Sequence, residues 1–174
     1  MTSALVERLR SRLRADQVRD TAAELHLYRH DASNMSGRPA VVCFAETVDD
    51  VREAVRAAND FGVPFVARGS GTGLAGGAVP APGSIVISTS KMNRILSVDA
   101  VNRQAWVEPG VLNLDLSKQI AHLGVHFAPD PSSQQTCSIG GNVANNSGGP
   151  HCLADGVTSA HIHAVEVVLP DGSI

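Results

Sequence analysis

The apolar positions at the start of the chain recur with a helical period. Leu5, Leu9 and Leu13 are spaced four residues apart, and Val18, Ala22 and Leu25 continue a second stripe. Ser3 is a residue type that caps helices. Residues 3–31 therefore predict two surface helices.

A β-α-β unit is predicted between residues 40 and 67. The short apolar run at residues 40–45 follows turn signals at residues 36–39, which is typical of a buried strand. A helix is expected to begin after Thr47, an N-cap residue type, and to end at Gly62. Asp49 and Asp50 suit the positive end of this helix dipole. Residues 63–67 then predict a second strand.

The remaining pattern predicts shorter elements separated by loops. We expect a strand at residues 84–88, a hairpin pairing 95–99 with 104–108, and a helix at 112–123, with Asn113 as a cap and Gly124 as its stop. A loop-rich stretch at 128–149 has one short helix around Val143. Residues 161–169 predict a strand, because they are rich in valine and alternate loosely, and residues 170–172 predict a turn. Since only two residues follow this turn, we expect the chain to be the front portion of a longer protein.

Composition and charge narrow the class of protein. The chain has 174 residues, 43% of them apolar and 18% charged, which is typical of a packed domain. Its net charge is −3 and aromatic residues make up 3%, so it has neither the basic stripe nor the stacking platforms that nucleic-acid binding requires. The sequence has three irregularly spaced cysteines, no signal-peptide pattern and no apolar run of membrane-spanning length. These features predict a cytoplasmic protein with reduced thiols and no membrane span.

Glycine is the unusual feature of the sequence. Five glycines occur in nine residues, Gly69 to Gly77, directly after a predicted strand. Such a loop can turn several N–H groups toward one point and bind phosphate without side-chain charge, and Ser70 and Thr72 can add hydroxyl donors. Pro80 and Pro82 exclude the helix that a Rossmann fingerprint needs, and no Gly-Lys-Ser/Thr of a P-loop follows. A flexible linker is the alternative interpretation.

A second polar, glycine-rich region covers residues 129–149. Its Asn and Ser side chains and two Gly-Gly pairs suit a flat heterocycle, whose carbonyls and ring nitrogens they would meet edge-on. The alternative is a long structured loop in which Asn and Gly supply left-handed turns.

Zinc is a competing hypothesis for residues further along the chain. His151, Cys152, His161 and His163 are suitable ligand types, but their spacing matches no zinc motif. Cys137 is interpreted as a small buried residue, since no neighbouring cation would lower the pKa of its thiol.

Six motifs together resemble one known family. They are the glycine segment from Ala67, Met-Asn-Arg-Ile-Leu-Ser-Val-Asp from Met92, Val-Glu-Pro-Gly from Val107, Pro-Asp-Pro-Ser-Ser from Pro129, Ser-Ile-Gly-Gly-Asn-Val-Ala from Ser138 and Glu-Val-Val-Leu-Pro-Asp-Gly from Glu166. Their order is similar to that in FAD-linked oxidases of the vanillyl-alcohol oxidase and p-cresol methylhydroxylase type. Within that family the chain most resembles the flavin subunit of glycolate oxidase and the D-lactate dehydrogenases.

The resemblance implies a cofactor and a set of residues that bind it. The cofactor is FAD, with its pyrophosphate on the glycine loop, its flavin and ribityl chain near residues 129–146, and its adenosine near residues 166–167. Because residues 69–77 contain no His that would tether the flavin, the FAD is expected to be noncovalent. The implied cofactor-binding residues are Arg68, Gly69, Ser70, Gly71, Thr72, Gly73, Leu74, Gly76, Gly77, Pro129, Asp130, Ser132, Ser138, Gly140, Gly141, Asn142, Ala144, Asn146, Glu166 and Val167.

The resemblance also implies a fold and an activity. The fold class is α+β, a two-lobed FAD-binding domain truncated at its C-terminal end, with a helical segment at 1–35, a first lobe at 36–90 and a second at 91–174. The activity is oxidation of a small 2-hydroxy acid, glycolate or D-lactate, by hydride transfer to FAD. No catalytic residue is assigned. A C-terminal substrate-domain polypeptide or an electron-accepting subunit is the expected partner. The alternatives are a non-catalytic FAD-binding fragment, half of a split enzyme, and a His/Cys metal-binding domain.

Overall fold

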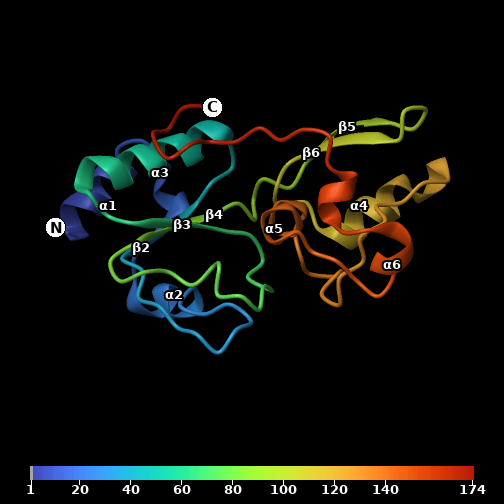
Figure 1. The fold of residues 1–174 in the computed structure, drawn as a ribbon. Helices are drawn as coiled ribbons and strands as arrows, with labels where there is room; N and C mark the ends of the chain where they lie inside the picture. Colours follow the sequence, from blue (N-terminus) through green and yellow to red (C-terminus); the bar gives the residue numbers. More distant parts are fainter. Residues whose placement is uncertain (1) are drawn as a thin grey trace. The chain divides into compact units, whose positions relative to one another are not determined.

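The computed structural model describes residues 2–174, which form two compact units (Figure 1). The first unit contains the chain up to Lys91 together with Glu166–Ile174, and the second unit contains Met92–Val165. Each unit is described by itself. The domain boundaries expected from the sequence, after residues 35 and 90, stay a prediction.

A four-stranded sheet forms the centre of the first unit. Its strands are β1 (Val18–Arg19), β2 (Val41–Phe44), β3 (Phe65–Arg68) and β4 (Ile85–Ser88), in the order β1-β2-β4-β3. β2, β4 and β3 are parallel, and β1 is antiparallel to β2. Apart from Ser88, the central strands β2 and β4 consist of apolar residues, as is usual for parallel strands that are buried on both faces. The three strands predicted around residues 40–45, 63–67 and 84–88 are confirmed.

Helix α3 (Val48–Phe61) connects β2 to β3, as the sequence predicted. The Thr47 hydroxyl accepts a hydrogen bond from the Asp50 N–H at 3.2 Å, and Gly62 ends the helix in the left-handed region at φ 61°. The apolar stripe that includes Ala54 and Val55 is buried. The helix therefore has a polar outer face and a packed inner face.

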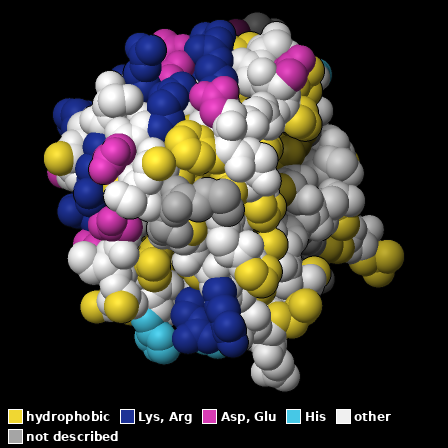
Figure 2. All heavy atoms as spheres, turned by 90° about the vertical axis from the view of Figure 1, so that its left-hand side faces the viewer, with side chains coloured by type: hydrophobic (Ala, Val, Ile, Leu, Met, Phe, Trp, Pro, Cys, Tyr) yellow, Lys and Arg dark blue, Asp and Glu magenta, His cyan; other side chains and the backbone are white. Residues whose placement is uncertain are grey.

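The two helices predicted over residues 3–31 are present as α1 (Thr2–Arg10) and α2 (Ala22–Leu27), and Leu5 and Leu9 form the buried face of α1. The prediction is wrong at Val18, which was placed in a helical stripe. Val18 lies in strand β1, since pairing with Cys43 of β2 outweighs its place in a helical stripe. Arg8 of α1 forms an ion pair with Glu53 of α3 at 3.4 Å. Over the upper and left part of the face shown in Figure 2, Lys and Arg side chains lie among Asp and Glu side chains.

The second unit has a small core of its own. It contains the predicted hairpin, strands β5 (Ile95–Asp99) and β6 (Gln104–Val107), and helix α4 (Asn113–Ile120), continued by the 3-10 turn η2 (Ala121–Leu123) up to Gly124. The short helix expected around Val143 is α5 (Ile139–Asn145). Helix α6 (Cys152–Asp155) and the 3-10 turn η3 (Thr158–His161) complete the unit. Its buried apolar residues are Val111, Leu116, Ile120 and Ile139.

The strand predicted at residues 161–169 is wrong. η3 includes His161, and residues 162–169 have no regular secondary structure. Valine content favours a strand only where a neighbouring strand supplies hydrogen bonds, and this segment pairs with no strand of residues 2–174. The turn at residues 170–172 is confirmed, because the Gly172 N–H donates to the Leu169 carbonyl at 2.8 Å and Gly172 has φ 80°. None of the helices formed by residues 2–174 combines the length and apolar character needed to cross a membrane.

Candidate cofactor-binding site

The glycine loop, residues 69–77, leaves strand β3 without forming a helix. None of its nine backbone N–H groups donates a hydrogen bond to any group of residues 2–174. Gly71 and Gly76 have φ of 71° and 75°, a region that glycine adopts without strain. A run of unpaired N–H groups is the property that an anion-binding loop needs.

Arg68, the last residue of β3, supports the glycine loop from its start. Its guanidinium donates to the carbonyl of His30 at 2.7 Å and lies 5.4 Å from the ring centroid of Tyr28. Burial lowers the pKa of Arg68, and the charge of Asp31 acts in the opposite direction. The group stays protonated, because guanidinium does not lose its proton in proteins. Arg68 is therefore held by the protein itself, and a direct contact with a cofactor stays a prediction.

The far end of the glycine loop is held by residues 31–35. An Asp31 carboxylate oxygen accepts from the Ala78 N–H at 3.4 Å, and a Cβ on Gly76 would lie 2.6 Å from the sulfur of Met35. Burial alone would raise the pKa of Asp31, but hydrogen bonds from Ser33 and Ala78 and the charge of Arg68 bring it below its ordinary value. The loop is thus fixed at both ends while its N–H groups remain unpaired.

The second unit brings together most of the site residues predicted between 129 and 146. Ser138 is the N-cap of α5, and its hydroxyl accepts from the Gly141 N–H at 3.3 Å. The Gly140 N–H donates to the Pro109 carbonyl at 2.8 Å, and a Cβ on Gly140 would lie 2.6 Å from Cβ of Pro109. Gly140 and Gly141 therefore serve packing within the unit, and their N–H groups are already paired.

Asp130 and His151 form an ion pair at the surface of this unit. Oδ2 of Asp130 lies 2.5 Å from Nδ1 of His151. A Cβ on Gly149 would overlap the Asp130 carbonyl, so glycine is required there. Pro129 is buried and Ser132 is exposed.

Asn113 is the residue that the sequence interpretation missed. It was expected as a helix cap, but the N-cap position is Leu112, and Asn113 is the fully buried first residue of α4. Its Nδ2 donates to the carbonyl of Pro129 and to Oδ1 of Asn142, both at 2.9 Å. In a sequence, a polar residue at the start of a helix is normally interpreted as a cap. Only the burial of Asn113 shows that its side chain instead joins Pro129 and Asn142.

The remaining predicted residues lie outside these contacts. Ala144 is exposed, and Asn146 ends α5 at φ 48° with its Oδ1 accepting from the Ser159 N–H. Glu166 and Val167 belong to the first unit and are exposed. Their assignment to adenosine stays a prediction.

The zinc hypothesis has no support in the described geometry. His161 is hydrogen-bonded to the Asp155 carbonyl at 2.7 Å, and Cys152 Sγ accepts from the Gly149 N–H at 2.8 Å. Across residues 2–174, no three His, Cys, Asp or Glu side chains are grouped so as to hold a metal ion.

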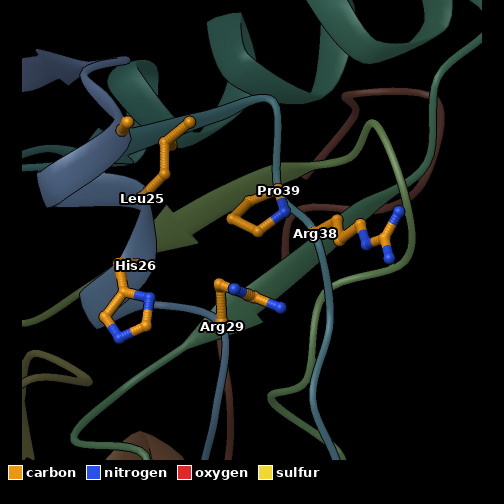
Figure 3. A pocket seen from close by; sticks show the side chains of 6 residues that line it. Leu25, His26, Arg29, Arg38 and Pro39 are labelled. Atoms are coloured by element: carbon orange, nitrogen blue, oxygen red, sulfur yellow. The ribbon is translucent and has the colours of Figure 1, made fainter.

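A hollow of about 350 Å³ lies beside α2, away from the predicted site residues. Figure 3 shows Leu25, His26 and Arg29 on the helical side of this hollow and Arg38 and Pro39 across from them. Arg29 donates to the Gly37 carbonyl at 3.0 Å and so fastens the turn before β2. No predicted site residue lines this hollow, and we assign it no part in the site.

Comparison with known proteins identifies the family. A family described as "FAD binding domain" matches residues 39–174. This chain belongs to that family. The chain is 39% identical over 172 residues to "Glycolate oxidase subunit GlcD" of Escherichia coli (strain K12), covering 98% of this chain and 34% of that protein. It is 37% identical over 149 residues to "D-lactate dehydrogenase" of Anaerostipes hadrus, covering 84% and 31%.

A solved structure confirms the α+β fold class. The crystal structure of p-cresol methylhydroxylase with substrate bound has a TM-score of 0.83 to this chain at 23% identity, covering 98% of this chain and 34% of that one. The family resemblance seen in the six motifs is confirmed by the match of the FAD binding domain family to residues 39–174. The chain spans about a third of the length of the curated relatives it matches.

The described residues fit the cofactor for which the FAD binding domain is named. The pyrophosphate of FAD is anionic and accepts hydrogen bonds, and residues 69–77 offer unpaired N–H groups beside the buried positive charge of Arg68. Positive φ explains glycine at positions 71 and 76, and at position 71 a Cβ would also meet the guanidinium of Arg68, which is held by the His30 carbonyl.

Proposed function

We propose that this chain is the FAD-binding part of a flavin-dependent oxidoreductase that oxidises a small 2-hydroxy acid, glycolate or D-lactate. The observation that carries the proposal is the run of nine N–H groups at residues 69–77 with no acceptor within residues 2–174. Membership of the FAD binding domain family supports FAD as the anion bound there. The names of the relatives, glycolate oxidase subunit GlcD and D-lactate dehydrogenase, support the substrate class.

Each part of the chain has its own task in this proposal. The glycine loop holds the pyrophosphate through backbone N–H groups, and Arg68 and Asp31 keep the loop in shape. Residues 129–146 contact the flavin and ribityl parts through small and polar groups. Since the loop contains no His, the binding is noncovalent.

The chemistry supplied by the flavin, when bound, is acceptance of the hydride from the α-carbon of the hydroxy acid. The hydroxyl proton also leaves, so the product is a 2-oxo acid. The substrate must lie with its α-carbon about 3–3.5 Å from the flavin and with a base within reach of its hydroxyl. We place the residues that hold the substrate in the part of the relatives that this chain does not cover, or in a partner polypeptide.

Two measurements test the proposal at separate levels. Titration of the purified chain with FAD, followed by flavin fluorescence and calorimetry, is expected to show saturable binding that ADP competes away. Absence of such binding in a folded chain would reject the proposed function. A hydroxy-acid assay with a dye acceptor is expected to show no turnover by the 174 residues alone, but turnover with glycolate or D-lactate once the remaining polypeptide is present. Dye reduction by the chain alone would contradict our placement of the substrate residues.

A further inference from the structure

Asn113 joins three segments of the second unit through one buried side chain. It is 0% exposed, so its amide group has exchanged water entirely for protein contacts. Its backbone N–H donates to the Cys137 carbonyl at 3.0 Å, and its side chain donates to Pro129 O and Asn142 Oδ1. Helix α4, the loop at Pro129 and helix α5 therefore meet at this residue.

The polarity of these hydrogen bonds is fixed by the carbonyl of Pro129. A carbonyl oxygen only accepts, so Asn113 must present its NH₂ group on that side. The same NH₂ group faces Asn142, so Asn142 must present its oxygen in return. Asn113 Oδ1 is consequently left buried without a partner among the described residues, a cost that shows how strongly the other two contacts are retained.

This polarity leaves a hydrogen-bond donor on Asn142. Oδ1 of Asn142 accepts from Asn113 Nδ2 and from Cys137 Sγ at 3.7 Å. Its Nδ2, at the other end of the same amide, donates to no group in residues 2–174, and although Asn142 is only 1% exposed, Nδ2 is not enclosed as Asn113 Oδ1 is. A donor that is held in place and can still be reached from outside the protein can pair with an acceptor on a bound molecule.

We propose that Asn113 is a positioning residue that locks the orientation of the Asn142 amide, so that Asn142 Nδ2 donates to a carbonyl oxygen or ring nitrogen of the FAD ring system. This inference rests on the proposed function, and it adds a residue and a direction of hydrogen bonding. Asn113 acts only through Asn142 and the Pro129 carbonyl.

The substitution Asn113→Asp tests whether Asn113 fixes the orientation of the Asn142 amide, and it hardly changes the size of the side chain. The buried Asp has no proton to donate when ionised and only one when protonated, so it cannot serve both Pro129 O and Asn142 Oδ1 as the amide does, and the Asn142 amide becomes free to turn and present its oxygen where the donor was. The variant Asn142→Asp removes the same donor but still accepts from Asn113, which keeps the hydrogen bonds of the unit. Asn59→Asp on α3 is the matched control, since it carries the same change of charge and loses one hydrogen bond to a backbone carbonyl, Pro170 O.

The readouts are the affinities of the full chain for FAD and for ADP, which has the pyrophosphate but no flavin ring. We expect both site variants to bind FAD about tenfold more weakly, with ADP affinity within about twofold of the parent and with the absorption spectrum of residual bound flavin shifted. The control should leave both affinities unchanged. Thermal unfolding shows which variants fold. If Asn113→Asp does not fold, the FAD and ADP affinities of Asn142→Asp test the proposal.

Each other outcome overturns the inference. Equal losses for FAD and ADP would mean that Asn113 is merely structural, and no loss for FAD would mean that the Asn142 donor does not meet the ring. If the parent chain binds ADP but not FAD, the proposed contact of Asn142 with the flavin ring is wrong, while pyrophosphate binding by residues 69–77 is still supported. If the folded parent binds neither, the proposed function fails and this inference with it.

Discussion

A Cβ on Gly71 would lie 2.7 Å from Cζ of Arg68, so the guanidinium fills the space that any side chain at position 71 would need. Gly71 also has φ 71°, which L-residues with a Cβ rarely adopt. The two residues are therefore coupled: the loop can pass over the buried Arg68 only where residue 71 is glycine.

A comparison of Gly71→Ala with Gly62→Ala should separate the cost of a positive φ from the cost of displacing the Arg68 guanidinium. Gly62 has φ 61° and nothing within 4 Å of its Cβ position, so alanine there should cost only about 1–2 kcal/mol of backbone strain. Gly71→Ala should cost more in urea unfolding, because it also displaces Arg68 from the His30 carbonyl, and should abolish ADP and FAD binding. Equal costs for the two variants, with ADP binding intact, would contradict the coupling.

Bound flavin should be removable from the protein. Since residues 69–77 contain no His, acid precipitation of the FAD-loaded chain should release all of the flavin into the supernatant. The check is fluorescence of the supernatant and of the polypeptide on a denaturing gel, with free FAD as the control for recovery. Fluorescence that migrates with the denatured chain would reveal a covalent anchor elsewhere.

The stability of the second unit should depend on pH through His151 and Asp130. Their hydrogen bond raises the pKa of His151 above its ordinary 6.5 and lowers the pKa of Asp130 below 3.8, and Asp155 adds to the rise for His151. The His151 contribution is complete below pH 6.5 and is lost as the pH rises through its raised pKa. The Asp130 contribution is complete above pH 3.8 and is lost as the pH falls through its lowered pKa.

The variant His151→Gln should therefore lose most stability, relative to the parent, near pH 5 and least above pH 8. Urea unfolding at these two pH values measures the difference, and His122→Gln, on an exposed turn, is the control. The effect should be small and reduced by salt, because His151 is 70% exposed. A difference between parent and variant that is the same at pH 5 and pH 8 would exclude the ion pair as its cause.

The adjacent glycines that begin α5 should respond very differently to alanine. A Cβ on Gly140 would lie 2.6 Å from Cβ and 2.9 Å from the carbonyl oxygen of Pro109, whereas a Cβ on Gly141 would meet only the Ser138 hydroxyl at 3.2 Å. Gly140→Ala should destabilise the chain by about 1–3 kcal/mol, as overpacking does, and Gly141→Ala by much less. Chemical denaturation of both variants measures this, and equal values would show that α5 does not dock on Pro109 as described.

Local chemistry made the first unit largely predictable from sequence. Thr47 and Gly62 mark the ends of α3 by side-chain capping and by backbone freedom, and both act within a few residues. The glycine loop was predictable for the same reason, since consecutive glycines and the prolines at 80 and 82 exclude a helix whatever surrounds them. Features that depend on nearest neighbours in sequence are visible in the sequence.

Features that depend on distant partners were not predictable in this way. Val18 joins a strand because Cys43, 25 positions later, pairs with it, and residues 162–169 remain irregular because they pair with no described strand. Asn113 has the pattern of a cap, yet its contacts are with residues 129 and 142. Its role follows from burial and hydrogen-bond polarity, which only the fold supplies.

The first unit is discontinuous in sequence, since Glu166–Ile174 returns to it after the whole second unit. Arg52 and Asn59 of α3 donate to the carbonyls of Gly172 and Pro170, across more than a hundred residues of intervening chain. During synthesis α3 can therefore obtain these last contacts only after residues 92–165 have emerged from the ribosome. The unit that is begun first is therefore completed last, because its final strap of nine residues is the last part of this sequence to be made.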